Sequence, residues 1–277
     1  GSFGIALSAI GLAQFFLYPD LRNLWYLGWD PHYYRVFATL LDPNYVGILL
    51  VLTIFVWVYQ FATNKKWRMW FAPFFIVAGI ALILTYSRSS YLAIMGGTIA
   101  AVVLLKRWKV GLFLILAFLV AIVYIPKPGG DTLSLDRYDS SVARIQNWGR
   151  TITRIGERPV FGYGFNVVPF LEKTEASALP GRSGAGIDSS ILFVAVTTGV
   201  VGLLGYLLLL GSQVTLIHQS KETAFKILMY ATLTAVALHS LFVNSMFYPW
   251  VMVWMWVLAG VVEKEIKSTK HEIRNKS

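Results

Sequence analysis

Long runs without a charged residue are the feature that most constrains how this chain can fold. The runs cover residues 1–19, 43–64, 69–87, 89–105, 110–126, 189–220 and 227–262. A membrane-spanning helix needs about 20 predominantly apolar residues. The last run is interrupted at residues 244–249, so we interpret it as two short spans. The sequence therefore predicts an all-α, polytopic helical membrane protein with about eight transmembrane helices.

The composition excludes several other classes. Only 14% of residues are charged, whereas about a quarter are charged in an ordinary soluble domain. The chain has no cysteine and its four histidines are scattered, so neither thiolate sites nor a histidine metal site is expected. The net charge of +10 could indicate nucleic acid, but in a membrane protein it more often reflects cytoplasmic lysines and arginines. We therefore expect no nucleic-acid partner.

We interpret residues 1–277 as a single membrane domain. The chain begins Gly-Ser-Phe rather than Met, so we expect a truncated N-terminus with further spans before residue 1. Alternatively, Gly1 and Ser2 are a cloning scar.

The short loops carry a charge bias that predicts the topology. Basic residues gather in four places: residues 65–68, 106–109, 221–226 and the tail 263–277. By the positive-inside rule these segments are cytoplasmic. The extracytoplasmic side then receives residues 20–42, the Arg88 turn, residues 127–188 and the turn at residues 244–248.

Residues 127–188 form the only large loop predicted outside the membrane, and loops of this length are usually functional. Within it, an amphipathic helix is predicted over residues 141–158, with Ser140 or Ser141 as its N-cap and Pro159 as its end. Apolar residues recur there at helical spacing: Ile145, Trp148, Ile152 and Ile155.

Arg88 is the only charged residue between residues 69 and 105, and hydroxyl side chains surround it in the sequence. An arginine between two predicted spans is costly near lipid and is a functional candidate by default. The simpler alternative is a loop residue that reaches the lipid headgroups.

Arginines also gather on the predicted outer side. The set is Arg88, Arg144, Arg150, Arg154, Arg158 and Arg182, with Asp188 beside it. Because arginine binds phosphate through two parallel hydrogen bonds, the set suggests an anionic lipid or a lipid-linked phosphate. For Arg150, Arg154 and Arg158, which repeat every four residues, we favour a solvent-facing stripe on the helix.

Asp188 has two interpretations, which are compatible. It precedes the run at residues 189–220, where a carboxylate can act as a general base or as the N-cap of the helix. The sequence favours the cap. Earlier in the chain, Asp42-Pro43-Asn44 is typical of a helix start.

Several segments carry a family resemblance, in a fixed order along the chain. They are Arg35-Val-Phe-Ala-Thr-Leu-Leu-Asp-Pro43-Asn44, Thr85-Tyr-Ser-Arg88-Ser-Ser-Tyr-Leu, Arg144-Ile-Gln-Asn-Trp148, Glu157-Arg-Pro159-Val-Phe-Gly162-Tyr-Gly164, and Asp188-Ser-Ser followed by Thr198-Gly199-Val-Val-Gly202. Together the segments resemble the O-antigen ligase / O-antigen polymerase superfamily of bacterial membrane glycosyltransferases.

The resemblance implies an activity. Such enzymes move a glycan from an undecaprenyl-diphosphate carrier to a glycan, lipid or protein acceptor, at the extracytoplasmic face of the bacterial inner membrane. They need no metal or other cofactor, because arginines neutralise the diphosphate. Membrane lipid is an expected partner.

By resemblance, the catalytic residues are Asp188, Arg88 and Arg144. The substrate-binding residues are Arg88, Arg144, Arg35, Asn44, Trp148 and Arg150. One departure concerns the start of the helix after residue 188, where ligases of this family usually carry a histidine. This chain has Asp188 at that position, followed by Ser189. We expect the Asp188 carboxylate to take the histidine's place as the base.

Two alternatives stay open. One is a transporter or flippase of the lipid-linked glycan, with the same arginines lining its path. Transporters more often have interrupted helices in corresponding halves and polar groups at mid-membrane. Only His218 and His239 are ionisable within the long uncharged runs, and His218 is near a cytoplasmic end, which argues against transport. The other alternative is a non-catalytic relative, which the missing histidine allows.

Overall fold

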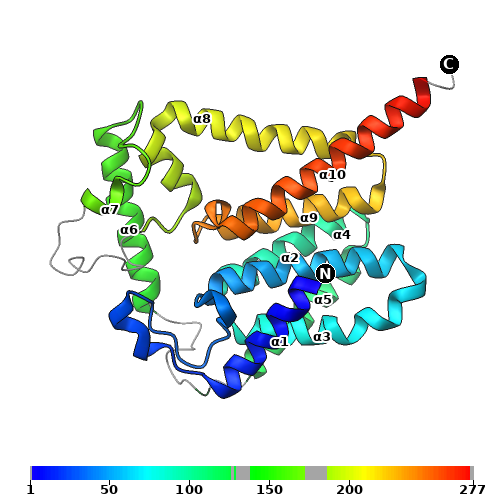
Figure 1. Ribbon diagram of the computed structural model, residues 1–277, viewed down its shortest axis with the longest axis horizontal. Helices are drawn as coiled ribbons and strands as arrows, with labels where there is room; N and C mark the ends of the chain where they lie inside the picture. The colour runs from blue at the N-terminus through cyan, green and yellow to red at the C-terminus, as the bar shows by residue number, and fades with distance from the viewer. Residues whose placement is uncertain (1, 126–127, 129–137, 172–185, 275–277) are drawn as a thin grey trace.

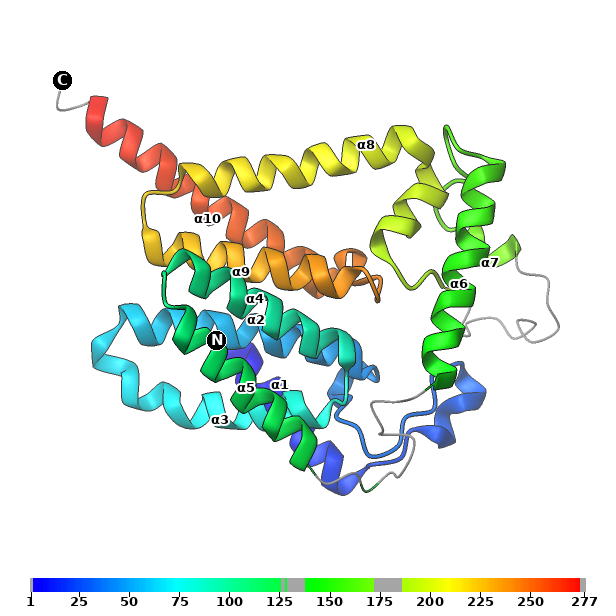
Figure 2. The ribbon, with the colours of Figure 1, turned by 180° about the vertical axis from the view of Figure 1, so that it is seen from behind.

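The computed structural model describes residues 2–125, 128, 138–171 and 186–274, which are helical apart from turns, loops and one isolated bridge between Asp20 and Tyr33. Long helices run along one another and α6 lies across one end of the bundle (Figures 1 and 2). The helices are α1 (Ser2–Leu17), α2 (Pro43–Thr63), α3 (Arg68–Leu84), α4 (Arg88–Leu104), α5 (Trp108–Tyr124), α6 (Tyr138–Glu157), α7 (Val168–Leu171), α8 (Ser190–Gln219), α9 (Thr223–Ser240) and α10 (Pro249–Arg274), with short 3-10 turns η1 (Arg22–Leu27), η2 (Ala38–Leu40), η3 (Lys65–Trp67) and η7 (Ser245–Phe247).

The all-helical prediction is confirmed, and a long helix lies in each of the eight predicted segments. Among the described residues, α2 and α8 are long and apolar enough to cross a membrane. Four further apolar helices are shorter: α1, α4, α5 and residues 72–84 of α3. The number of membrane crossings stays a prediction.

Helix α2 lies at the centre of the core, and α4 packs closely on α9. Glycine makes this close approach possible at Gly97. A Cβ there would lie 2.5 Å from the Phe55 ring of α2 and 2.7 Å from the backbone oxygen of Ala231 in α9. Small residues let membrane helices approach through their backbones in this way. The three helices α2, α4 and α9 therefore form the rigid frame below the turn that carries Arg88.

Helix α8 differs from the single span predicted at residues 189–220. It bends at Gly199, whose backbone (φ 64°, ψ −165°) is not helical. The bend separates a short arm, residues 190–198, from a long arm, residues 200–219. Only the long arm, at 1.5 Å per residue, has the length of a membrane span.

The bend is held by the turn that follows α6, at residues 159–164. Tyr163 N donates to Val196 O (2.9 Å), and Val200 N donates to Pro159 O (2.8 Å). Gly162 also has a positive φ (67°), and a Cβ there would lie 2.6 Å from Val196 O. The Gly162-Tyr-Gly164 turn and the Gly199 bend therefore form one structural unit. The backbone of each supplies hydrogen-bond partners to the backbone of the other.

Helix α6 begins at Tyr138, so the predicted N-cap at Ser140 or Ser141 is wrong, because both residues lie inside its first turn. Its end at Glu157, two residues before Pro159, agrees with the prediction. Asn147 and Thr151 face the protein and are buried. Ile145 and Ile152 are more than half exposed on the opposite face.

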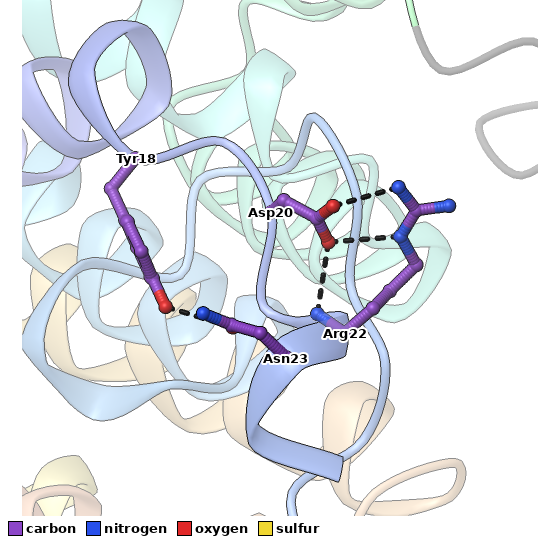
Figure 3. A network of polar contacts seen from close by, with 4 residues as sticks. All are labelled: Tyr18, Asp20, Arg22 and Asn23. Carbon is purple, nitrogen blue, oxygen red and sulfur yellow. Dashed lines mark hydrogen bonds and ion pairs between the residues drawn. The ribbon is translucent and has the colours of Figure 1, made fainter.

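The segment after α1 is folded by an exposed polar network (Figure 3). Arg22 donates from Nε and from its backbone N to Asp20 Oδ1, both at 2.9 Å, and forms an ion pair with Oδ2 at 2.7 Å. The Arg22 guanidinium also lies 4.1 Å from the centre of the Tyr33 ring. Exposed ion pairs stabilise little. The contact between Arg22 and Tyr33 nevertheless joins the segment after α1 to residues 30–35, which line the site described below.

The described parts of the predicted extracytoplasmic segments meet at one end of the bundle, where α6 lies (Figure 1). The loops after α2, α4 and α8 lie at the other end (Figures 1 and 2). Tyr59 near the end of α2 donates to Glu222 (3.0 Å) before α9. This arrangement is the one that the predicted topology requires, while the side of the membrane that each end faces stays a prediction.

The bend in α8 generates a first testable prediction. Gly199→Ala should destabilise the protein by more than about 1 kcal/mol, because a positive φ is sterically unfavourable for alanine and the added Cβ would clash with the backbone of Val160. Gly205→Ala, in the long arm of the same helix, is the control, since nothing lies within 4 Å of a Cβ there. Thermal unfolding in detergent measures both. Equal stability of the two variants would contradict the role of the bend.

Candidate functional site

A cleft of about 690 Å³ opens at the end of the bundle covered by α6. Its walls come from the segment before α2, the starts of α2 and α4, α6, the short arm of α8 and the turn after α9. The structure brings five of the predicted site residues together on this cleft: Arg35, Asn44, Arg88, Arg144 and Asp188. They are separated by up to 153 positions in the sequence, from 35 to 188.

Arg88 is the first residue of α4, directly after the N-cap Ser87, whose Oγ accepts from Ser90 N. The side chain is half-buried and lines the cleft. Because the N-terminus of a helix carries a partial positive charge, a cation there adds to an existing positive potential. Such a position favours binding of an anion such as a phosphate.

Arg35 is buried below this turn and holds it in place. Its Nε donates to Thr85 O (2.8 Å) and one of its terminal nitrogens donates to Tyr86 O (3.3 Å). Tyr86 has a positive φ of 50°, so the turn is strained without such support. Arg35 was predicted to bind substrate. It does line the cleft, but the bonds described here position the turn that presents Arg88.

Arg144 faces the cleft from α6 and interacts electrostatically with Asp188 and Arg88. Burial lowers the pKa of Arg144, the negative charge of Asp188 opposes that change, and the positive charge of Arg88 adds to it. Burial raises the pKa of the Asp188 carboxyl, and Arg144 opposes the change. The three residues predicted to be catalytic therefore act on one another within a single cleft.

Asp188 does not cap α8, so the interpretation that the sequence favoured is wrong. The N-cap is Ser189, and Asp188 is the residue before it. The segment is held instead by Asn147 of α6, whose Nδ2 donates to Gly186 O (3.0 Å) while its Oδ1 accepts from Asp188 N (3.4 Å). The carboxylate is thereby left to the cleft rather than to the helix start.

Asp42, in contrast, is a cap. Its Oδ1 accepts from Asn44 N (2.6 Å) and Tyr45 N (3.4 Å), and Pro43 occupies the first helical position of α2. Burial raises the pKa of the Asp42 carboxyl, and its two backbone hydrogen bonds oppose that change.

Trp148 and Arg150 do not line the cleft. The Trp148 ring packs on Phe242, with ring centres 5.8 Å apart, and Phe242 lines the cleft. Arg150 is exposed on α6, but its charge opposes the rise that burial causes in the pKa of Asp188. Arg158 is exposed and lies over the Tyr163 ring, whose hydroxyl donates to Glu157. Arg182 lies outside the described residues.

Sequence reasoning missed the role of His239, which is fully buried in α9. Its Nε2 lies 3.1 Å from Ser89 Oγ and 3.2 Å from Ser90 Oγ, and its Nδ1 lies 3.0 Å from Ser245 Oγ. We call His239, the serines at positions 87, 89, 90 and 245, and Asn44 the hydroxyl network. The only feature of the sequence that distinguished His239 was its position inside the uncharged run 227–262.

The hydroxyl network connects the segments that carry site residues. Ser87 Oγ donates to Asn44 Oδ1 (2.8 Å), which joins the starts of α4 and α2. Ser245 begins η7, and the next backbone nitrogen, Met246 N, donates to Ser190 Oγ (3.2 Å) at the start of α8. Asn44, Arg88 and the residues next to Asp188 are thus fixed relative to one another through α9.

Other cleft residues were also missed: Asp30, His32, Asn166, Phe193, Phe242 and Asn244. Asp30, His32, Asn166 and Asn244 come from segments that the predicted topology places on the outer side, whereas Phe193 and Phe242 lie near the ends of predicted spans. No spacing in the sequence distinguishes any of them. Among the described residues, no three histidine or acidic side chains converge as a metal site. The metal independence expected from the resemblance stays a prediction.

Comparison with known families agrees with the resemblance. A family model described as O-antigen ligase matches residues 73–207. This part of the chain therefore belongs to the O-antigen ligase family, which confirms the prediction made from the motifs. The matched region contains Arg88, Arg144, Asp188 and the bend of α8, whereas Arg35, Asn44 and His239 lie outside it. Comparison with curated proteins gives no match.

The hydroxyl network generates a second prediction. His239→Phe keeps an aromatic ring but removes the imidazole hydrogen bonds to the buried hydroxyls of Ser89, Ser90 and Ser245, so the free energy of unfolding should fall by about 1–3 kcal/mol. His218→Phe is the control, because His218 is exposed near the other end of the bundle, where substitutions usually change stability by less than about 0.5 kcal/mol. A His239→Phe protein as stable as the control in denaturant unfolding would show that the network contributes little.

Proposed function

We propose that this protein transfers or polymerises a glycan from an undecaprenyl-diphosphate carrier onto an acceptor, as a metal-independent membrane glycosyltransferase. The family domain at residues 73–207 implies chemistry on lipid-linked glycans. The observation that carries the proposal is the convergence of Arg88, Arg144 and Asp188 on one cleft. The reaction would occur at the extracytoplasmic face of the bacterial inner membrane.

The two arginines would bind the diphosphate. Their planar guanidinium groups match phosphate oxygens in pairs and stay charged when partly buried. Charge develops on the diphosphate as its bond to the anomeric carbon breaks, and fixed cations in a partly buried cleft stabilise that charge. Arg35 and the hydroxyl network support this step by holding the Arg88 turn.

Asp188 would accept the proton of the acceptor hydroxyl. That oxygen then forms a bond to the anomeric carbon while the bond from this carbon to the diphosphate breaks, so the transfer inverts the configuration. Undecaprenyl diphosphate leaves with the bonding electrons. A carboxylate with a raised pKa is a stronger base than an ordinary aspartate, which suits this role.

The transport alternative has less support in the positions of the polar groups. The cleft lies at one end of the bundle, and the buried His239 is tied into the hydroxyl network next to it. A path through the membrane would need polar groups at mid-depth. The following experiment identifies the acceptor of the glycan, which is a second glycan, a lipid or a protein.

The direct test is transfer by the purified protein in lipid vesicles. Radiolabelled lipid-linked oligosaccharide is supplied with candidate acceptors, and the products are separated by size. A ladder of products indicates a polymerase, and a single addition indicates a ligase. Movement of the labelled lipid across the bilayer without any covalent product would identify a transporter and contradict the proposal.

A third prediction concerns the arginines. Arg88→Lys and Arg144→Lys should each lower kcat by on the order of 10², because lysine keeps the charge but loses the paired hydrogen bonds. Arg154→Lys on α6 is the matched control and should change activity little, since Arg154 does not line the cleft. Loss of activity in the control with normal Arg88→Lys activity would mean that different arginines bind the diphosphate.

A fourth prediction concerns Asp188 and pH. Because the pKa of Asp188 is raised, the carboxyl becomes protonated at a higher pH than an ordinary aspartate when the solution is acidified. A protonated carboxyl cannot accept a proton, so kcat/KM should fall as the pH falls through that value. Asp188→His should move the fall toward the pKa of histidine, about 6.5. Asp188→Asn should abolish turnover while the donor still binds. An active Asp188→Asn protein would remove Asp188 from the mechanism.

A further inference from the structure

One wall of the cleft combines two aromatic rings with an amide. Phe242 and Asn244 come from the turn after α9, and Phe193 comes from the short arm of α8. Both phenylalanine side chains are only partly buried, so part of each ring is open to the cleft. We call these three residues the aromatic wall. Ligand sites typically join apolar surface of this kind to a few polar groups that fix the orientation of the ligand.

Neighbouring rings hold the two phenylalanines of the aromatic wall. Trp148 of α6 packs on Phe242, with ring centres 5.8 Å apart. Phe247 of η7 packs on Phe193, with ring centres 5.0 Å apart. Aromatic pairs at such distances stabilise beyond the area that they bury. The two rings are therefore positioned before any ligand binds.

The third member of the wall, Asn244, contributes a buried hydrogen-bond acceptor. It is the N-cap residue of η7, yet its side chain makes no capping hydrogen bond. Its Oδ1 is buried and has no hydrogen-bond partner in the part of the chain that the structure describes. A buried acceptor without a partner is costly, and such groups are rare in native proteins. Because the amide torsion of asparagine is soft, a small rotation presents this oxygen to a donor group in the cleft.

The hydroxyl network ties the amide end of the wall to Arg88. Asn244 precedes Ser245, whose Oγ lies 3.0 Å from His239 Nδ1. On the other side of the imidazole, His239 Nε2 lies 3.1 Å from Ser89 Oγ. Ser89 follows Arg88 in the first turn of α4. Asn244 and Arg88 are thus fixed relative to each other on the same cleft.

The aromatic end of the wall lies beside Arg144. Arg144 is four residues before Trp148, so both side chains lie on one face of α6. Because Trp148 packs on Phe242, the Phe242 ring lies next to that face. A group bonded to a diphosphate between Arg88 and Arg144 therefore lies against the aromatic wall.

We propose that the aromatic wall binds the sugar that is joined to the diphosphate of the donor, an inference that rests on the proposed function. The apolar C–H face of the sugar ring packs on Phe193 and Phe242, and a hydroxyl or acetamido N–H group of the sugar donates to Asn244 Oδ1. The carrier that remains after transfer has no sugar and loses these contacts. The wall therefore favours the glycosylated substrate over the spent carrier, which helps the carrier to leave.

The test compares two probes binding to the purified full chain in detergent: undecaprenyl diphosphate, and undecaprenyl diphosphate that carries one N-acetylglucosamine. The wild-type protein should bind the glycosylated probe more tightly. Asn244→Leu keeps a side chain of similar size but removes the acceptor, so it should weaken binding of the glycosylated probe at least about threefold, the effect of one hydrogen bond, with the bare carrier unchanged. Asn64→Leu is the matched control, since Asn64 is also half-buried but follows α2 at the other end of the bundle.

Thermal unfolding and a second variant separate sugar binding from a structural role. Because Asn244 Oδ1 has no partner in the described part of the protein, Asn244→Leu should not lower the melting temperature. A lower melting temperature would contradict the claim that this oxygen is kept for a ligand. Phe242→Leu removes the flat ring but keeps an apolar side chain, so it should also weaken binding of the glycosylated probe alone.

Arg88→Lys separates this inference from the proposed function. It should weaken binding of both probes, because both carry the diphosphate. If the wild-type protein binds the two probes equally, if Asn244→Leu weakens both equally or neither, or if Asn64→Leu has the same effect, the wall does not bind the sugar, even when Arg88→Lys behaves as expected. If Arg88→Lys changes neither probe, the diphosphate site in the proposed function is wrong, and the effect of Asn244→Leu still decides the wall.

Discussion

Hydrogen bonding of buried polar groups is the constraint on which the site depends. Polar groups in an apolar bundle are costly unless they pair within the protein. Here His239 pairs with the hydroxyls of Ser89 and Ser90 on one side and with Ser245 on the other. Because Ser89 and Ser90 belong to α4 and Ser245 to η7, pairing them with His239 fixes the start of α4 relative to the turn after α9. The position of Arg88, the first residue of α4, at the cleft follows from that fixed start.

A second constraint acts through the backbone. The bend of α8 at Gly199 turns its short arm toward the cleft, and the turn after α6 holds this bend by backbone hydrogen bonds. The same turn fixes the C-terminal end of α6. Asn147, near Arg144 in the first half of α6, ties the helix to the segment before Ser189. Arg144 and Asp188 therefore reach the cleft as parts of one assembly, although 44 positions separate them in the sequence.

The sequence predicted the long helices well, because a helix that crosses a membrane appears in the sequence as a long run of apolar residues. It also predicted, through resemblance, five residues that meet on the cleft. It failed where the outcome depends on distant partners. The bend at Gly199 has the backbone of Val160 beside it, and nothing in the sequence distinguishes this glycine from Gly202, Gly205 and Gly211 in the same apolar run. The cap was assigned to Asp188 from its position before the apolar run, but Asp and Ser cap helices about equally well, and the N-cap position is occupied by Ser189.

The most direct test of the central claim is a structure of the protein in a lipid nanodisc with undecaprenyl diphosphate bound. We expect the diphosphate between the guanidinium groups of Arg88 and Arg144, close to Asp188. A diphosphate bound instead on α6 at Arg150 and Arg154, outside the cleft, would contradict the assignment of the cleft as the active site.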